Sequence, residues 1–289
     1  MNYFDPKTNR FPYPLYTDKH YLEVKKDNGL VFDKNYPYID KSKRFRFEYG
    51  LVRFLLYILV FLLARIRLNL RIKGKKNLRI YKDVLNKGVI SVCNHVHMWD
   101  YIGIMSAVKP HRTMLLSWAP NIRGENGWLI RHVGGIPIPE NDVRATAKFA
   151  SSIIDQLNNG GWLHIYPEGS MWEFYQPVRP FKQGASYFAC KANKPILPLA
   201  YSYRKNGWIR RKLFNSPASF TLTIGEPIYP DNSLPFKEAQ EKITIEAHDA
   251  VCRLANIDPK ENLYKPVFDN DKRVDYYTKE YGVGYKKSW

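Results

Sequence analysis

Two histidines and one aspartate lie close together in NHVHMWD, residues 94–100 of a chain with 7 histidines in all. His95 and His97 could begin a metal site, because alternate residues of an extended segment point to the same side. His95 and Asp100 could instead form a general base and its partner, in which the carboxylate holds the imidazole Nδ1–H and leaves Nε2 to take a proton from a hydroxyl. A plain helix start, with Asp100 as a cap and His95 packed beside it, is the third interpretation.

The metal interpretation lacks further ligands. The step from His97 to Asp100 does not match the H-x-H-x-D-H pattern that is common in metallohydrolases. The more distant histidines at positions 111, 132 and 164 come without a paired ligand nearby. We therefore expect no metal site and do not favour a metal-dependent hydrolase.

The base-and-partner interpretation depends on the local fold. Five positions along a straight helix would turn His95 and Asp100 about 140° apart. A loop between a strand and a helix would let them meet, with Asp100 in the first helical turn, where the helix dipole favours a negative charge. The apolar run GVISVCN before the motif and YIGIMSAV after it predict such a strand and helix. This stretch alone leaves the base-and-partner role and the capping role open.

Short apolar runs alternate with amphipathic segments from about residue 80 onward. We expect strands at 88–94, 113–118, 161–167, 195–201 and 219–225, and helices at 141–160, 183–193 and 236–256. This alternation predicts an α/β fold, with a mostly parallel or mixed sheet flanked by helices. The loop YPEGSMW follows the third run, so Glu168 and Gly169 should lie at the carboxyl end of a strand, where open α/β sheets build their sites.

The chain divides into three predicted regions. Residues 1–40, rich in Tyr, Pro, Asn and Lys, form an N-terminal arm, and residues 41–79 form a basic and apolar helical segment. Residues 80–289 form the α/β domain with a polar C-terminal tail. Three distant cysteines predict neither a disulfide framework nor a structural zinc site, which favours a reducing, cytosolic setting. No apolar core begins the chain, so we expect no signal peptide.

The segment 41–79 predicts contact with a membrane. Its apolar run, 54–64, would extend roughly 16 Å as a helix, against about 30 Å for the hydrocarbon core of a bilayer. Basic residues lie on both sides of this run, and the net charge of +18 also favours an anionic partner. We expect a helix that dips into one leaflet, which makes the protein monotopic or peripheral on the cytoplasmic face of the cell membrane. A short tilted span through 51–67 and a buried core helix are the alternatives.

The motifs together resemble those of the glycerolipid acyltransferase family, which contains the 1-acylglycerol-3-phosphate acyltransferases. The N-H-x-x-x-x-D block of that family is matched by Asn94, His95 and Asp100, and its F-P-E-G-T/S block by YPEGS, residues 166–170. Further blocks are matched by GGIPIPEN, by KPILP at 194–198 and by TIGEPI at 223–228. All of them occur in the order of the family.

The resemblance implies an O-acyltransferase of phospholipid biosynthesis, which moves a fatty acyl group from acyl-CoA or acyl-ACP to a lysolipid hydroxyl. His95 would be the base and Asp100 its partner, while Asn94, Glu168 and Gly169 would belong to the substrate-binding part of the site. The acceptor would be 1-acylglycerol-3-phosphate, and the product phosphatidate. No cofactor is implied beyond the thioester co-substrate, since the acceptor hydroxyl is itself the nucleophile.

Two departures from the family pattern leave the acceptor open. Met171 stands where members acting on lysophosphatidate usually carry Arg, and IPIPEND lacks the Arg that usually ends the second block. Arg179 and Lys182 could supply positive charge instead, and His97 could contact a substrate or pack the loop. Another lysophospholipid or a glycolipid is therefore an alternative acceptor. The alternative of another class is a non-catalytic basic protein that binds membrane or nucleic acid, although no nucleic-acid-binding module is visible and we expect no such partner.

Overall fold

The computed structural model describes residues 27–175, 177–214 and 218–262. Most of the expected N-terminal arm and the C-terminal tail from residue 263 lie outside the described residues. The elements in chain order are α1 (Lys43–Leu55), the π-helical turn η1 (Leu56–Val60), α2 (Phe61–Leu68), β1 (Arg71–Lys73), α3 (Lys75–Ile80), α4 (Lys82–Leu85), β2 (Val89–Val92), α5 (Asp100–Val108), β3 (Thr113–Ser117), α6 (Ala119–Arg123), α7 (Gly127–His132), β4 (Gly135–Pro137), α8 (Val143–Asn158), β5 (Trp162–Ile165), α9 (Gly184–Ala192), β6 (Ile196–Lys205), α10 (Trp208–Phe214), β7 (Ala218–Ile224) and α11 (Phe236–Leu254).

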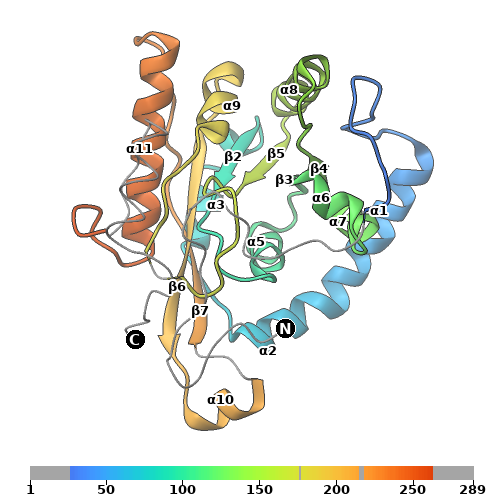
Figure 1. The fold of residues 1–289 in the computed structure, drawn as a ribbon. Coiled ribbons are helices and arrows are strands. Elements are labelled where there is room, and N and C mark those ends of the chain that lie inside the picture. Colours follow the sequence, from blue (N-terminus) through green and yellow to red (C-terminus); the bar gives the residue numbers. More distant parts are fainter. Residues whose placement is uncertain (1–26, 176, 215–217, 263–289) are drawn as a thin grey trace.

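A 7-stranded sheet with the order β1-β7-β6-β2-β5-β3-β4 forms the centre of the fold (Figure 1). Neighbouring strands are parallel, except that β6 and β7 form an antiparallel pair. The α/β class with a mixed sheet is therefore confirmed, and the five expected strands correspond to β2, β3, β5, β6 and β7. β1 and β4 have only 3 residues each, which is too short to give an apolar period.

Each face of the sheet builds its own apolar core. Along β2, Val89 and Cys93 belong to one cluster, while Ile90 and Val92 belong to the other, because successive side chains of a strand point to opposite faces. The helices α5 and α1–η1–α2 pack on the first cluster, and α8, α9 and α11 pack on the second (Figure 1). Both faces of the central strands are therefore buried, which explains why their sequences are continuous apolar runs.

The N-terminal helix runs without interruption from Lys43 to Leu68, with the π-helical turn η1 in its middle. The Ser42 side chain caps its start by accepting a hydrogen bond from the Phe45 amide, and Asn69, in the left-handed conformation, ends it. One side packs on the domain, and the Arg53 guanidinium on that side donates to the His111 carbonyl. Among the described residues, no helix combines the length and the apolar character that crossing a bilayer requires.

The segment 41–79 is tied to the sheet that follows it. Its strand β1 pairs with β7, and buried side chains of its helix belong to the same apolar cluster as β2 and α5. The proposed division at residue 80 stays a prediction.

Two loops leave the sheet at the same edge and come to lie side by side. β2 and β5 are parallel neighbours, with Val92 opposite Ile165 in the register. The segment after Val92, which contains the histidines, and the segment after Ile165, which contains YPEGS, therefore start next to each other.

Gly88 offers a test of how tightly the start of β2 is held. Its φ is +111°, and a Cβ on it would lie 2.0 Å from the Leu157 carbonyl oxygen of α8. We expect Gly88→Ala to lower the free energy of unfolding by about 2–4 kcal/mol, through backbone strain and the clash. Gly184→Ala, in open space at the start of α9, should change it by less than about 1 kcal/mol. Urea denaturation measures both, and equal effects would contradict the close approach.

Candidate active site

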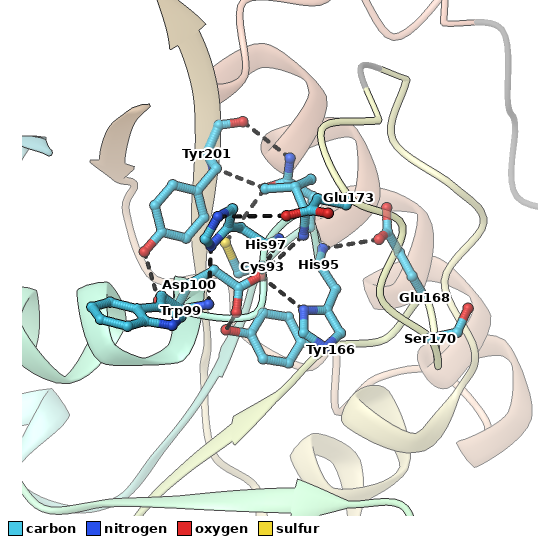
Figure 2. A network of polar contacts seen from close by, with 12 residues as sticks. Cys93, His95, His97, Trp99, Asp100, Tyr166, Glu168, Ser170, Glu173 and Tyr201 are labelled. Carbon is cyan, nitrogen blue, oxygen red and sulfur yellow. Dashed lines mark hydrogen bonds and ion pairs between the residues drawn. The ribbon is translucent and has the colours of Figure 1, made fainter. Parts of the chain in front are cut away.

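The carboxylate of Asp100 connects both ends of the NHVHMWD motif (Figure 2). Asp100 is the first residue of α5, and its Oδ2 lies 2.8 Å from His95 Nδ1. The same oxygen accepts hydrogen bonds from the amides of Val96, at 3.0 Å, and His97, at 3.3 Å. The strand–loop–helix geometry that the motif required is therefore present, and Asp100 serves both as partner of the imidazole and as the acceptor for the loop amides. The Nε2 atom of His95 is the ring nitrogen that does not face Asp100.

The protonation state of Asp100 follows from competing effects. The side chain is 1% exposed, and burial by itself would raise the pKa of a carboxyl. The His95 imidazole and the hydrogen bonds from His95, Tyr166 and Val96 outweigh burial and hold the pKa of Asp100 below its ordinary value. A carboxylate is thus kept charged inside the protein, where it can stabilise an imidazolium.

Tyr166 completes the environment of the pair. Its hydroxyl donates to Asp100 Oδ1 at 2.7 Å, and its ring stacks on the His95 imidazole with the centroids 3.9 Å apart and the planes 12° from parallel. Burial first, and the Asp100 charge second, raise the pKa of Tyr166 well above its ordinary value. The phenol therefore stays protonated and acts as a donor.

Asn94 joins the histidine loop to β6. Its side-chain oxygen accepts from the Tyr201 amide at 2.8 Å, and its side-chain nitrogen donates to the Tyr201 carbonyl at 3.0 Å. The Tyr201 hydroxyl in turn donates to the Asp100 carbonyl at 2.6 Å. Asn94 is fully buried, so the geometry gives it a positioning role.

Glu168 and Arg179 form a buried ion pair behind the YPEGS loop. Their side chains are 2% and 1% exposed, and Arg179 Nη2 lies 2.7 Å from Glu168 Oε2. Glu168 Oε2 also accepts from the His95 amide at 2.9 Å, and Glu168 Oε1 accepts from the Arg179 amide at 2.9 Å. Arg179 further donates to the Ser170 hydroxyl at 2.8 Å and to the Ser170 carbonyl, and its guanidinium lies over the Trp172 ring. This pair holds the two loops together, and its two charges neutralise each other, although the buried Arg179 Nε has no hydrogen-bond partner among the described residues.

Gly169 and Lys182 lie on the exposed side of the same loop. Gly169 has a φ of +80°, and a Cβ on it would come within 2.8 Å of Lys182 Nζ. The Lys182 amide donates to the Pro167 carbonyl at 2.8 Å, which holds the backbone of this exposed residue against the loop. Contact of Gly169 and Lys182 with a substrate stays a prediction, as does such contact for Asn94, Glu168 and Arg179.

His97 is engaged within its own loop. Its Nδ1 accepts from the Trp99 amide at 3.1 Å, and its Nε2 lies 3.6 Å from Glu173 Oε1. This arrangement corresponds to the packing role, one of the two that the sequence left open. In the part of the chain that the structure describes, no group of three or more His, Cys, Asp or Glu side chains could hold a metal ion.

Tyr166 and Tyr201 belong to the site, although the sequence patterns had indicated no role for either of them there. Tyr166 directly follows β5, and Tyr201 lies within β6. Each tyrosine hydroxyl donates a hydrogen bond to Asp100. A tyrosine at the end of a buried apolar run was the available signal, because a buried phenol usually needs a hydrogen-bond partner.

Parts of this chain are similar to known proteins. Residues 69–202 match the family model described as Acyltransferase. Over 141 residues the chain is 26% identical to human 1-acyl-sn-glycerol-3-phosphate acyltransferase beta. This aligned region covers 48% of this chain and 50% of the human protein. The chain therefore spans about half the length of this curated relative. The crystal structure of the 1-acyl-sn-glycerophosphate acyltransferase PlsC from Thermotoga maritima superposes with a TM-score of 0.47 and 18% identity, over 75% of this chain and 85% of that one.

The ion pair of Glu168 and Arg179 predicts a large stability effect. Arg179→Met should lower the free energy of unfolding by about 3–5 kcal/mol, because it leaves the buried Glu168 carboxylate without its cation. Lys242→Met, which breaks the more exposed pair with Asp231, should cost less than about 1 kcal/mol. Urea denaturation of both variants compares the pairs, and a loss below about 1 kcal/mol for Arg179→Met would contradict the role of the pair as the link between the loops.

Proposed function

We propose that this chain, whose residues 69–202 match the Acyltransferase family model, is an O-acyltransferase that transfers a fatty acyl group from a thioester to a lysolipid hydroxyl. The observation that carries this proposal is the His95–Asp100 pair at the carboxyl edge of the sheet, with Nδ1 held at 2.8 Å and Nε2 directed away from its partner. A base oriented in this way suits proton abstraction from a hydroxyl.

The proposed reaction needs no covalent enzyme intermediate. The acceptor oxygen forms a bond to the thioester carbonyl carbon while its proton passes to His95 Nε2. The tetrahedral intermediate then breaks its C–S bond, and the leaving thiolate takes the proton back from His95. Asp100 stabilises the imidazolium between these two steps. The proposal includes acyl-CoA or acyl-ACP as co-substrate and no resident cofactor.

The acceptor proposed first is 1-acylglycerol-3-phosphate, with phosphatidate as the product and phospholipid biosynthesis as the setting. The printed name of the human relative refers to this class of acceptor. The Arg179 side chain is 1% exposed and cannot reach a substrate, whereas Lys182 is accessible on the exposed side of the YPEGS loop. Lys182 is therefore the better candidate of the two for an acceptor phosphate. Another lysophospholipid or a glycolipid remains the second acceptor class, because of Met171 and the absent arginine at 139–142.

The N-terminal helix supports a place on the cytoplasmic face of the cell membrane, as a monotopic or peripheral protein. The helix side that does not pack on the domain exposes large apolar residues, namely Phe47, Leu51, Phe54, Leu55, Ile58, Leu59, Leu62, Leu63 and Ile66. Basic side chains flank this apolar face at Lys41, Lys43, Arg44, Arg46, Arg65 and Arg67. Such a pattern suits burial in the outer part of one leaflet, with the cations at anionic headgroups.

The short helix α10 adds apolar surface beside the end of α2. Its Arg210 donates to the carbonyls of Ile66 and Arg67, which fixes the two helices side by side. Trp208, Ile209 and Leu213 of α10 are exposed. An exposed Trp beside basic residues suits the membrane–water interface.

An acceptor panel tests the enzymatic proposal. Purified protein should acylate 1-acylglycerol-3-phosphate from a labelled acyl thioester, and His95→Gln should lower the rate by about 10²–10⁴-fold, because the base is lost. Lys182→Met should raise KM for this anionic acceptor by about tenfold, with little effect on an uncharged lyso-glycolipid.

The matched control is Lys87→Met, an exposed lysine that precedes β2 at the opposite edge of the sheet. It should leave KM unchanged. Full activity of His95→Gln, or no transfer to any acceptor in the panel, would refute the proposed function. Equal KM values for the two lysine variants would refute the role of Lys182.

Vesicle binding tests the proposed membrane face. The triple variant Leu55→Gln, Leu59→Gln and Leu62→Gln should weaken binding to vesicles of phosphatidylcholine and phosphatidylglycerol by about a hundredfold or more, because three exposed apolar side chains no longer enter the leaflet. Ile80→Gln, Val143→Gln and Ile245→Gln, three exposed positions elsewhere, form the control. Similar binding of both triple variants would show that the helix is not the anchor. Substitution is preferable to deleting residues 41–70, since that segment also packs in the core.

A further inference from the structure

Tyr166 contacts both members of the His95–Asp100 pair. Its hydroxyl lies 2.7 Å from Asp100 Oδ1, and its ring lies against the His95 imidazole at a centroid distance of 3.9 Å. Figure 2 shows the phenol beside the imidazole, with its oxygen directed at the carboxylate. The two contacts come from one side chain at the end of β5, whereas His95 and Asp100 belong to the loop after β2 and to α5.

The hydrogen bonds to Asp100 are divided between its two oxygens. Oδ2 accepts from the imidazole and from the amides of Val96 and His97, while Oδ1 accepts from Tyr166. A hydrogen bond from a neutral donor disperses the negative charge of the carboxylate and lowers its attraction for a proton or a cation. The phenol therefore competes with the imidazolium for the charge of Asp100.

The ring contact acts on the orientation of the imidazole. The Tyr166 ring is nearly parallel to the imidazole and covers one of its faces. The bond to Asp100 already fixes the Nδ1 edge of the ring. Together these contacts hold the plane of the imidazole and the direction of Nε2, which general base catalysis requires.

We propose that Tyr166 is a positioning residue for the acyl transfer, which holds the plane of the His95 imidazole and, through its hydrogen bond to Asp100, sets the pH at which His95 becomes a base. The catalytic part of this proposal rests on the proposed function. The two contacts on which the proposal rests do not depend on the reaction at this site.

Other titratable groups surround the pair and bear on the same pH. From β5, His164 is fully buried, and burial lowers its pKa to about 3, so it stays neutral. Burial, with the Asp100 charge second, raises the pKa of both Tyr201 and Cys93 well above the ordinary values, so both stay protonated. Glu168 faces the His95 amide and is paired with Arg179, and His97 faces Glu173; both groups are present unchanged in the variants below.

The variant Tyr166→Phe separates the hydroxyl from the ring. It keeps the stacking surface and removes the donor to Asp100, so the negative charge of Asp100 interacts more strongly with protonated His95. The acidic limb of the pH profile of kcat/KM should move to higher pH by at least about half a unit, which lowers kcat/KM below the midpoint by about threefold. The variant Tyr166→Leu, which also removes the ring, should in addition lower kcat on the pH plateau.

Two readouts separate this proposal from the proposed function. The first is the pH profile of kcat/KM, and the second is the titration of the His95 ring followed by NMR, with His95→Gln used to assign the signal. The NMR midpoint of His95 should shift upward in Tyr166→Phe by the same amount as the acidic limb, and it is measurable without any acyl transfer. A protein that transfers no acyl group but shows the NMR shift would refute the enzymatic proposal and keep the role of Tyr166 in setting the titration.

Tyr101→Phe is the matched control. The Tyr101 hydroxyl is also buried, but it bonds to Thr113 and lies outside the His95–Asp100 pair. Tyr101→Phe should lose stability without moving either midpoint. The proposal is overturned if the midpoints of Tyr166→Phe stay within about 0.2 units of the wild type, or if Tyr101→Phe shifts them as far.

Discussion

A charged carboxylate buried at the start of a helix is the constraint on which the rest of this site depends. Asp100 is almost without solvent contact, so its charge must be satisfied by donors from the protein. Those donors are the His95 imidazole, two amides of the loop after β2, and the phenol at the end of β5. The backbone of Asp100 is held in turn by Tyr201 of β6. Because β6, β2 and β5 are neighbouring parallel strands, the groups that follow or belong to them meet on one side of the sheet, toward the carboxyl ends of these strands.

The second loop is organised by charge as well, but its charges cancel. Glu168 and Arg179 neutralise each other and bind the His95 amide, the Ser170 hydroxyl and the Ser170 carbonyl. Arg179, which the sequence suggested as a substrate-binding cation, thus holds the loop in place. Lys182, by contrast, lies on the exposed side of the same loop.

Local patterns carried most of the information about the fold. The five strands at 88–94, 113–118, 161–167, 195–201 and 219–225 could be predicted because buried central strands leave continuous apolar runs, and the long helices because their apolar spacing is regular. β1 could not, since its 3 residues are too few to show an apolar pattern. The meeting of His95 and Asp100 could be argued from a strand, a loop and a helix that follow one another directly.

The partners of that pair were harder to find from sequence. Tyr166 and Asp100 are 66 positions apart, and Tyr201 and Asp100 are 101 apart, so only the sheet order brings them together. The burial of Arg179 could not be foreseen either, because nothing in VRPFKQGA shows which of its two cations faces inward. The sequence shows which side chains are charged, but only the tertiary packing determines which of them point into the protein.

The π-helical turn η1 changes the angular phase of the side chains along the N-terminal helix. In a regular α-helix each residue advances by about 100°, so Ile66 would point about 100° away from Phe47, and the buried Leu68 about 120° away from the buried Leu56. One extra residue in a turn takes back about 100° of this drift. Both the exposed side and the packed side then run straight along the helix. If the sequence of this segment is read with a constant period of about 3.6 residues, apolar residues fall on all sides of the helix. The folded helix nevertheless has one exposed and one packed side.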